Sequence, residues 1–250
     1  LNGKPITFRA VLDWGYYNDK VAPTPDQDTI RRQFADMKKL GFNGVKLVLV
    51  IMNEEYYEIA DEMGILLWQE YPLWHMPIDK TTRDELLRMY DAFYRQDRNH
   101  PSIILRSITC EAGNVDQEVM GELYALGKRL IPNCLLEDNS SWFWLSNPKY
   151  ADFWDEHPYL TNPQWVRYIE NLDTVMAEKE PKPFLLGEAI AFNTWIDSEA
   201  LLRKVLELRP WWLPRVFESA LKLEEGLKKD YGENAVRILL ADSMKYALLH

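Results

Sequence analysis

The sequence of 250 residues is poor in the residues that build disulfide scaffolds and metal centres. It contains two cysteines, Cys110 and Cys134, and four histidines. Two cysteines are too few for a disulfide framework, and the cysteines and histidines show no metal-ligand spacing. We therefore expect no disulfide scaffold, no metal site and no cofactor.

Basic charge and long apolar segments are also missing. Lys and Arg number 29 against 39 Asp and Glu, which gives a net charge of −10. Phosphate binding needs clustered Lys and Arg, so we expect no nucleic-acid partner. No apolar run is long enough to span a membrane, so we expect no membrane association. The N-terminus has neither an initiator Met nor a signal peptide, which predicts a piece of a longer protein and leaves its localisation open.

Aromatic residues, in contrast, are abundant. The chain has 10 Trp, 13 Tyr and 9 Phe, and 47% of its residues are apolar, enough for a large core. We expect most aromatic side chains in that core. The others are candidates for a sugar-binding site, because aromatic faces stack on the apolar faces of sugar rings.

Short apolar runs alternate with amphipathic segments along the chain, a pattern typical of parallel α/β proteins. The predicted strands are Ile6–Leu12, Val45–Ile51, Ile65–Trp68, Ser102–Thr109, Leu135–Glu137, Ala151–Trp154 and Phe184–Gly187. Amphipathic helices are expected between them. The first is predicted to start at Thr24 as N-cap with Pro25 behind it, and the second to run from Glu54 to Gly64.

Seven βα units in order, spaced by about 20 to 40 residues, predict a (β/α)₈ TIM barrel as a single domain over residues 1–250. A doubly wound open sheet is the competing architecture, but it usually has a Gly-rich turn after its first strand. Here that turn, 13–17, holds bulky aromatic residues. After Leu208 the pattern is helical, so the barrel is expected to be truncated before strand eight.

Two glutamates follow predicted strands directly, Glu111 after strand four and Glu188 after strand seven. In such barrels the active site lies at the carboxyl ends of the strands. Strands four and seven lie on opposite sides of an eight-stranded barrel, so their carboxylates can face each other. Retaining glycosidases use two facing carboxyl groups about 5 Å apart. We therefore predict a carboxylate pair that cleaves glycosidic bonds.

Several motifs resemble glycoside hydrolase family 2, which includes β-galactosidases, β-glucuronidases and β-mannosidases. The stretch from Asn99 to Glu111 is the most specific, and Gly187-Glu188 and His157-Pro158-Tyr159 agree with it. The segments Leu1–Pro5, Leu40–Val45 and Asp61–Trp68 match as well. The resemblance spans nearly the whole chain and implies a retaining exo-β-glycosidase with β-sandwich domains upstream in the same protein.

The resemblance also implies residue roles. Glu188 is expected to be the nucleophile, Glu111 the acid/base, and Tyr159 the residue that holds Glu188. Further residues are expected to bind the carbohydrate substrate: Asp13, Trp14, Cys110, Asp138, Asn139, Trp142, His157 and Trp195. For the tryptophans a plain core position is the alternative, and for Asp138-Asn139 a simple turn.

Three positions depart from the family pattern. Cys110 stands where the family has an Asn that binds the sugar 2-hydroxyl, and a thiol is only a weak hydrogen-bonding group. Lys46 replaces Arg, and Arg106 replaces Trp, so the pocket floor is expected to differ.

These departures leave alternatives open. One is a catalytically impaired, carbohydrate-binding barrel. Another is a different hydrolase or lyase on the same barrel, since a fold does not determine a function. A large distance between Glu111 and Glu188 would favour the different hydrolase or lyase. A nucleophilic Cys110 is disfavoured because no histidine stands near it in sequence.

Overall fold

The structure is a computed structural model that describes residues 1–17, 21–141, 149–158, 162–177, 179–189, 228–229 and 232. The chain divides into two compact units, Leu1–Ile190 and Ala191–His250. All named helices and strands lie in the first unit. Of the predicted helical stretch after Leu208 only residues 228–229 and 232 are described, and the expected absence of strand eight falls outside the described residues.

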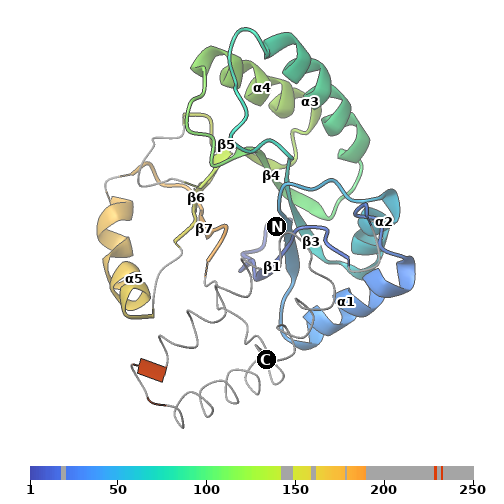
Figure 1. Cartoon of the computed structure of the whole chain (residues 1–250), viewed down its shortest axis with the longest axis vertical. Helices are drawn as coiled ribbons and strands as arrows, with labels where there is room; N and C mark the ends of the chain where they lie inside the picture. The colour runs from blue at the N-terminus through green and yellow to red at the C-terminus, as the bar shows by residue number, and fades with distance from the viewer. Residues whose placement is uncertain are drawn as a thin grey trace. The chain divides into compact units, whose positions relative to one another are not determined.

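Seven parallel strands follow one another in chain order (Figure 1). Five of them pair as one sheet: β1 (Ala10–Asp13), β2 (Gly44–Leu47), β3 (Leu66–Glu70), β4 (Ile103–Cys110) and β5 (Leu135–Ser140). The other two, β6 (Trp154–Glu156) and β7 (Phe184–Leu186), pair with each other. Parallel neighbours need a crossover between them, and helices supply it here.

The helices are α1 (Gln27–Lys39), α2 (Glu54–Met63), α3 (Arg83–Asp97), α4 (Gln117–Leu130) and α5 (Asn162–Ala177). The predicted N-cap of α1 was wrong. Asp26 caps this helix instead of Thr24, because its carboxylate accepts a hydrogen bond from the Thr29 amide. The predicted end of α2 at Gly64 is confirmed, since Gly64 has the left-handed conformation that favours glycine. Among the described residues, none of the helices is both long and apolar enough for a membrane span.

All seven predicted strands are present, with shifted bounds. The second strand ends at Leu47 instead of Ile51, because the chain turns at Leu49, whose φ is +54°. The fifth extends to Ser140, three residues beyond its predicted end. Asp138 and Asn139 therefore lie inside β5 and not after it, which changes the direction of their side chains.

The two faces of the sheet have different chemistry. The outer face packs on the helices through apolar clusters, one with α1 and α2 and one with α3 and α4. The opposite face carries buried polar residues, among them Lys46, Glu70, Ser107, Glu137 and Ser140. Side chains alternate between the faces of a strand, so each strand contributes to both.

Candidate active site

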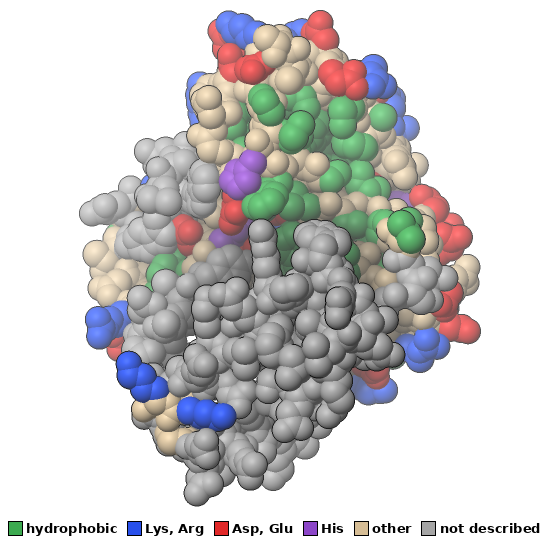
Figure 2. All heavy atoms as spheres, in the orientation of Figure 1, with side chains coloured by type: hydrophobic (Ala, Val, Ile, Leu, Met, Phe, Trp, Pro, Cys, Tyr) green, Lys and Arg blue, Asp and Glu red, His purple; other side chains and the backbone are tan. Residues whose placement is uncertain are grey.

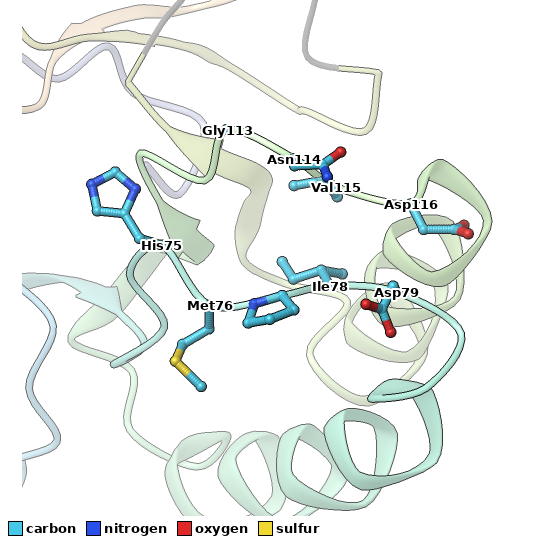
Figure 3. Close-up of a pocket in the computed structure, with 9 residues that line it drawn as sticks. His75, Met76, Ile78, Asp79, Gly113, Asn114, Val115 and Asp116 are labelled. Atoms are coloured by element: carbon cyan, nitrogen blue, oxygen red, sulfur yellow. The ribbon is translucent and has the colours of Figure 1, made fainter.

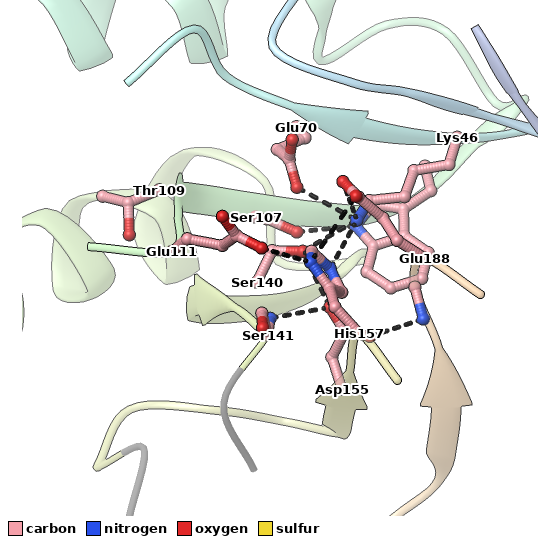
Figure 4. A network of polar contacts seen from close by, with 12 residues as sticks. Lys46, Glu70, Ser107, Thr109, Glu111, Ser140, Ser141, Asp155, His157 and Glu188 are labelled. Atoms are coloured by element: carbon pink, nitrogen blue, oxygen red, sulfur yellow. Dashed lines mark hydrogen bonds and ion pairs between the residues drawn. The ribbon is translucent and has the colours of Figure 1, made fainter. Parts of the chain in front are cut away.

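The inner face carries a buried polar network at the carboxyl ends of the strands (Figure 4). Its side chains come from four strands and from the turns that follow β4, β6 and β7. Its members are Lys46, Glu70, Glu111, Ser140, Asp155, His157 and Glu188. Buried charges are costly unless they are paired, so the pairing within this network decides what it can do.

Lys46 on β2 is the buried cation of the network. Its Nζ lies 3.1 Å from Glu70 Oε2 and 3.8 Å from Glu188 Oε1. It also donates a hydrogen bond of 2.8 Å to Ser140 Oγ. Burial lowers the pKa of Lys46, but the surrounding carboxylates raise the pKa by more, so the ammonium remains charged.

His157, directly after β6, contacts both predicted catalytic carboxylates through one ring nitrogen. Its Nδ1 lies 3.2 Å from Glu111 Oε1 and 3.7 Å from Glu188 Oε2. On the other side of the ring, Nε2 lies 3.1 Å from Ser140 Oγ and 3.3 Å from Asp155 Oδ2. Burial lowers the pKa of His157, but the hydrogen bond and charge of Asp155 raise it by more, and the net shift is upward.

Asp155 on β6 anchors this arrangement. Its Oδ2 accepts hydrogen bonds from Ser140 Oγ at 2.7 Å and from the Ser141 amide at 3.0 Å. Its Oδ1 accepts one from the Gly187 amide at 2.7 Å. Burial raises the pKa of Asp155, but the charge of Lys46 and the hydrogen bonds of His157 and Ser140 lower it by more, so the carboxylate is ionised.

Gly187, the residue before Glu188, lies so close to Asp155 that it has no room for a side chain. A Cβ at this position would lie 2.3 Å from Asp155 Oδ1, far inside van der Waals contact. Only a residue without a side chain lets the Gly187 amide reach Asp155. This hydrogen bond holds the turn after β7 against β6, and Glu188 is the next residue of that turn.

Glu111 begins the turn after β4 with an unusual backbone. Its φ is +49°, in the left-handed region that side chains other than glycine rarely adopt. The Glu111 amide donates to the Ser140 carbonyl at 3.0 Å, and Glu111 Oε2 accepts a hydrogen bond from Trp74 Nε1 at 3.2 Å. Strain of this kind clusters at functional sites, where the surrounding contacts hold it.

The predicted carboxylate pair is brought together. Because Glu111 Oε1 and Glu188 Oε2 both lie near His157 Nδ1, these two oxygens are no more than about 7 Å apart, a bound that includes the spacing of about 5 Å in retaining glycosidases. The Glu111 side chain is partly exposed, whereas Glu188 is buried. One carboxylate therefore meets solvent, and the other lies deeper in the barrel.

Cys110, the last residue of β4, lies beside the pair. Ligand atoms of Cys110, His157 and Glu188 all lie within 4.8 Å of one another. Burial, helped by Glu70, raises the pKa of the Cys110 thiol well above its usual range, so it is protonated and a poor nucleophile. Among the described residues, these three form the group that could hold a metal, but the adjacent Lys46 ammonium repels cations.

A second set of polar contacts joins β3, β4 and β5 on the inner face of the sheet, through Trp68, Ser107 and Glu137. Trp68 Nε1 donates to Ser107 Oγ at 2.6 Å, and that hydroxyl lies 2.5 Å from Glu137 Oε1. Burial, together with the charge of Asp155, raises the pKa of Glu137 well above its usual value, so Glu137 carries a proton. A neutral Glu137 does not compete with the other carboxylates for the charge of the Lys46 ammonium.

Asp13 and Trp14 lie at the end of β1, away from the contacts of the network. Asp13 accepts hydrogen bonds from the Gly15 amide at 2.8 Å and from the Tyr56 hydroxyl of α2 at 3.1 Å. Trp14 is 42% exposed. The structure therefore places Asp13 against the helix layer and leaves the Trp14 ring accessible to a ligand.

Asp138 and Asn139 serve neighbouring loops. Asp138 Oδ2 accepts hydrogen bonds of 3.1 Å from the amides of Lys149 and Tyr150, so its side chain points away from the carboxylate pair. Asn139 Oδ1 accepts a hydrogen bond from the Ala112 amide at 2.9 Å and thereby braces the turn of Glu111. The prediction that these residues follow strand five was wrong, because β5 extends through them.

Three predicted site residues cannot be placed, two contacting residues were missed by sequence reasoning, and Arg106 was misplaced. Trp142, Tyr159 and Trp195 fall outside the described residues. Trp74 and Asp155, both in contact with the site, carried no motif. Arg106 was expected to alter the pocket floor, but its guanidinium turns outward to Asp97 at 3.0 Å. Strand alternation from Ser107 would have revealed this outward direction.

The chain matches the family model for the glycosyl hydrolases family 2 TIM barrel domain over residues 1–193. It is 24% identical to a putative β-glucuronidase of Formosa agariphila, across 94% of this chain and 22% of that protein. It is 31% identical to a β-galactosidase of Oenococcus oeni, across 45% of this chain and 12% of that protein. The chain thus spans a quarter or less of these two relatives.

Solved structures agree on the fold. A β-glucuronidase from Ruminococcus gnavus superposes with a TM-score of 0.64 at 20% identity, covering 75% of this chain and 37% of that one. A family 2 β-galacturonidase from Eisenbergiella tayi, bound to galacturonate, gives a TM-score of 0.62 at 21% identity, covering 74% and 36%. The predicted TIM barrel and the predicted family are both confirmed: this chain belongs to glycosyl hydrolase family 2 and has its TIM barrel fold.

Proposed function

We propose that the protein is a retaining exo-β-glycosidase in which Glu188 is the nucleophile and Glu111 the acid/base. The observation that carries this proposal is the contact of both carboxylates with the same nitrogen, His157 Nδ1. Two carboxylates from opposite sides of a barrel, held this close, fit a double displacement at one sugar carbon.

In the first step Glu188 attacks the anomeric carbon while the glycosidic bond breaks and Glu111 gives its proton to the departing oxygen. A covalent glycosyl ester of Glu188 results. In the second step Glu111 takes a proton from water, the hydroxide attacks the same carbon, and Glu188 leaves as a carboxylate. The Lys46 ammonium, 3.8 Å from Glu188 Oε1, attracts the carboxylate of the nucleophile.

The substrate is proposed to be a terminal β-linked sugar. The relatives are named β-glucuronidase, β-galactosidase and β-galacturonidase, and these sugars are the first to test. Among the predicted binding residues, Cys110 and His157 border the carboxylate pair. Trp14, Trp142 and Trp195 remain proposed walls of the sugar site, and Tyr159 the proposed partner of Glu188.

Further domains are proposed for the whole protein. The chain covers 22% of the Formosa agariphila relative, so that protein has many residues outside the matched region. β-Sandwich domains upstream of the barrel are the expected ones, from the family resemblance.

A second candidate is a carbohydrate-binding barrel that has lost turnover. Cys110 favours it, because the protonated, buried thiol replaces the expected partner of the sugar 2-hydroxyl. Contacts to that hydroxyl are among those that contribute several kcal/mol to the transition state. Sugar binding without hydrolysis is the outcome expected for this candidate.

The test is a covalent trap. The intact protein is incubated with 2-deoxy-2-fluoro β-glycosides of glucuronic acid, galacturonic acid and galactose, and the adduct is located by peptide mass spectrometry. We expect one adduct, on Glu188, and none in Glu188→Gln. An adduct on another residue, or binding of the parent sugars without any adduct, contradicts the proposed mechanism.

A further inference from the structure

Trp74 lies at the end of the strand that carries the proposed acid/base, although it belongs to the loop after β3. It forms a parallel bridge with Cys110, the last residue of β4. The Cys110 amide donates a hydrogen bond of 3.1 Å to the Leu73 carbonyl, and the chain turns at His75, whose φ is +52°. The backbone on both sides of Trp74 is thereby fixed, which places its side chain beside Glu111.

Beyond this bridge the loops after β3 and β4 separate around a cavity of about 620 Å³ (Figure 3). The cavity is lined by residues 75–79 of the first loop and 113–116 of the second. Neither Trp74 nor Glu111 is among them, so the contact between these two residues belongs to the strand ends and not to the cavity. Figure 2 shows histidine and acidic side chains next to apolar ones on this face of the molecule.

Two rings divide the carboxylate oxygens of Glu111 between them. Trp74 Nε1 donates a hydrogen bond of 3.2 Å to Oε2, and His157 Nδ1 lies 3.2 Å from Oε1. The same His157 nitrogen lies 3.7 Å from Glu188 Oε2. Oε1 of Glu111 is therefore the oxygen on the side of the proposed nucleophile, and Oε2 is the oxygen on the side of the loop after β3.

The contact of Trp74 has a direction, because an indole nitrogen donates a hydrogen bond and cannot accept one. While this hydrogen bond persists, Oε2 of Glu111 is an acceptor, and the proton of the acid form sits on Oε1. A general acid must hold its proton within hydrogen-bond reach of the departing oxygen. In a glycosidase that oxygen lies between the two carboxyl groups, which is the side of Oε1.

We propose that Trp74 is a positioning residue that directs the acid proton to Oε1 of Glu111. In the first step this proton moves to the departing oxygen, while the glycosidic bond breaks and the bond to Glu188 forms. In the second step Oε1 takes a proton from water, and the hydroxide displaces Glu188. The indole keeps its own hydrogen throughout. This inference rests on the proposed function and adds the group that orients its acid.

The test removes the N–H of Trp74 in the intact protein in two ways. Trp74→Phe keeps an aromatic ring, and 52% exposure of Trp74 means that little core packing is disturbed. A second variant carries benzothienylalanine at position 74, which keeps the shape of the indole with sulfur in place of the N–H. The control is Met76→Ala, since Met76 is a similarly exposed residue of the same loop, at 55%.

Two substrates separate proton donation from other effects. They are the phenyl and the dinitrophenyl β-glycosides of the sugar that forms the adduct in the covalent trap. Phenolate is a poor leaving group and needs the proton of Glu111, whereas dinitrophenolate leaves without one. Both leaving groups are single aromatic rings, so differences in their binding to the enzyme are small.

We expect both variants at position 74 to lower kcat/KM for the phenyl glycoside by about tenfold or more, because general acid catalysis contributes about 10²–10⁴ and depends on orientation. For the dinitrophenyl glycoside kcat/KM should stay near that of the wild type. Its kcat and KM should fall together, because the second step slows and the ester of Glu188 accumulates. Met76→Ala should resemble the wild type on both substrates.

Equal losses of kcat/KM on both substrates would mean a general disturbance of the site and overturn the positioning role. A benzothienylalanine variant that matches the wild type overturns it too, because the N–H is then dispensable. The proposed function stands in both cases while the covalent trap still labels Glu188. A wild-type protein that cleaves neither aryl glycoside overturns both proposals.

Discussion

At the scale of single residues, Lys46 decides how the site tolerates so many buried carboxylates. Its side chain is 1% exposed, and its ammonium pairs with Glu70 and Glu188. Its neighbours explain why a charged residue occurs within an otherwise apolar strand. In the sequence Lys46 was visible only as a departure from an expected arginine, since nothing in β2 itself indicates its partners, Glu70 on β3 and Glu188 after β7.

We predict that Lys46→Met destabilises the fold by about 3–5 kcal/mol, because removal of one partner leaves buried carboxylates without their counter-charge. The free energy of unfolding from urea titration measures this loss. The double variant Lys46→Met/Glu70→Gln should regain part of the stability, because it removes a buried charge from each side. If the double variant is as unstable as the sum of both single variants, the pairing contributes nothing.

His157 makes stability depend on pH, with a sign that follows from its raised pKa. A histidine whose folded pKa exceeds the unfolded value of about 6.5 stabilises the fold fully below that pH. This contribution is lost as the pH rises through the folded pKa. We predict that the urea midpoint of the wild type falls from pH 6 toward pH 9 and that His157→Gln abolishes this part of the fall. An identical decline in both proteins would show that other groups cause it.

At the scale of elements, the order of strands and helices could be predicted, but the direction of individual side chains could not. Periodicity reveals that a strand exists, since apolar runs recur between helices. It does not fix the last residue, and a shift of three residues placed Asp138 and Asn139 inside β5. The Asp138 carboxylate and the Asn139 side-chain amide then bind neighbouring loops, as the hydrogen bond from the Tyr150 amide to Asp138 Oδ2 illustrates.

The contact between Asp155 of β6 and the turn after β7 also could not be predicted, because it is made by one backbone amide. Gly187 reaches Asp155 only because it has no side chain. A Gly-Glu pair is a weak sequence signal, but the structure gives the glycine a specific role. Gly187 fixes the turn from which Glu188 extends. Although it has no functional side chain, it therefore helps to position the predicted nucleophile.

We predict that Gly187→Ala destabilises the fold by about 1–3 kcal/mol, as overpacking usually does, and also removes activity because the turn of Glu188 shifts. The control is Gly64→Ala, at a left-handed helix end with open space around it. That variant should lose about 1 kcal/mol and keep its activity. Thermal unfolding and turnover of a β-glycosyl fluoride measure the two effects. Full activity in Gly187→Ala would mean that the turn tolerates the methyl group.

At the scale of the whole molecule, the barrel brings together carboxylates from β4 and β7 that are remote in the sequence. Their pairing was predictable, because the two strand ends face each other in a closed barrel. The bridging His157 was not, since its contacts to Glu111, Asp155 and Glu188 arise only when β6 lies beside β7. The fold therefore supplies the pair, and the polar network surrounds it with Lys46 and His157.

The proposed roles of the two glutamates predict different defects for their variants. Glu111→Ala should slow hydrolysis of a β-linked disaccharide by on the order of 10²–10⁴, because the departing sugar needs a proton. A β-glycosyl fluoride needs less assistance and should lose far less in the first step. Azide fits the space left by the carboxylate and should restore turnover of the fluoride. The product should be a β-glycosyl azide, because attack on the glycosyl ester of Glu188 restores the original configuration.

Glu188→Ala is the matched comparison, since the same side chain is shortened at the other end of the pair. It should not form a β-glycosyl azide, because without Glu188 no ester exists for azide to attack from the β face. Proton NMR distinguishes the α and β azides by the coupling of the anomeric proton. A β azide from Glu188→Ala, or an α azide from Glu111→Ala, would require the two roles to be exchanged.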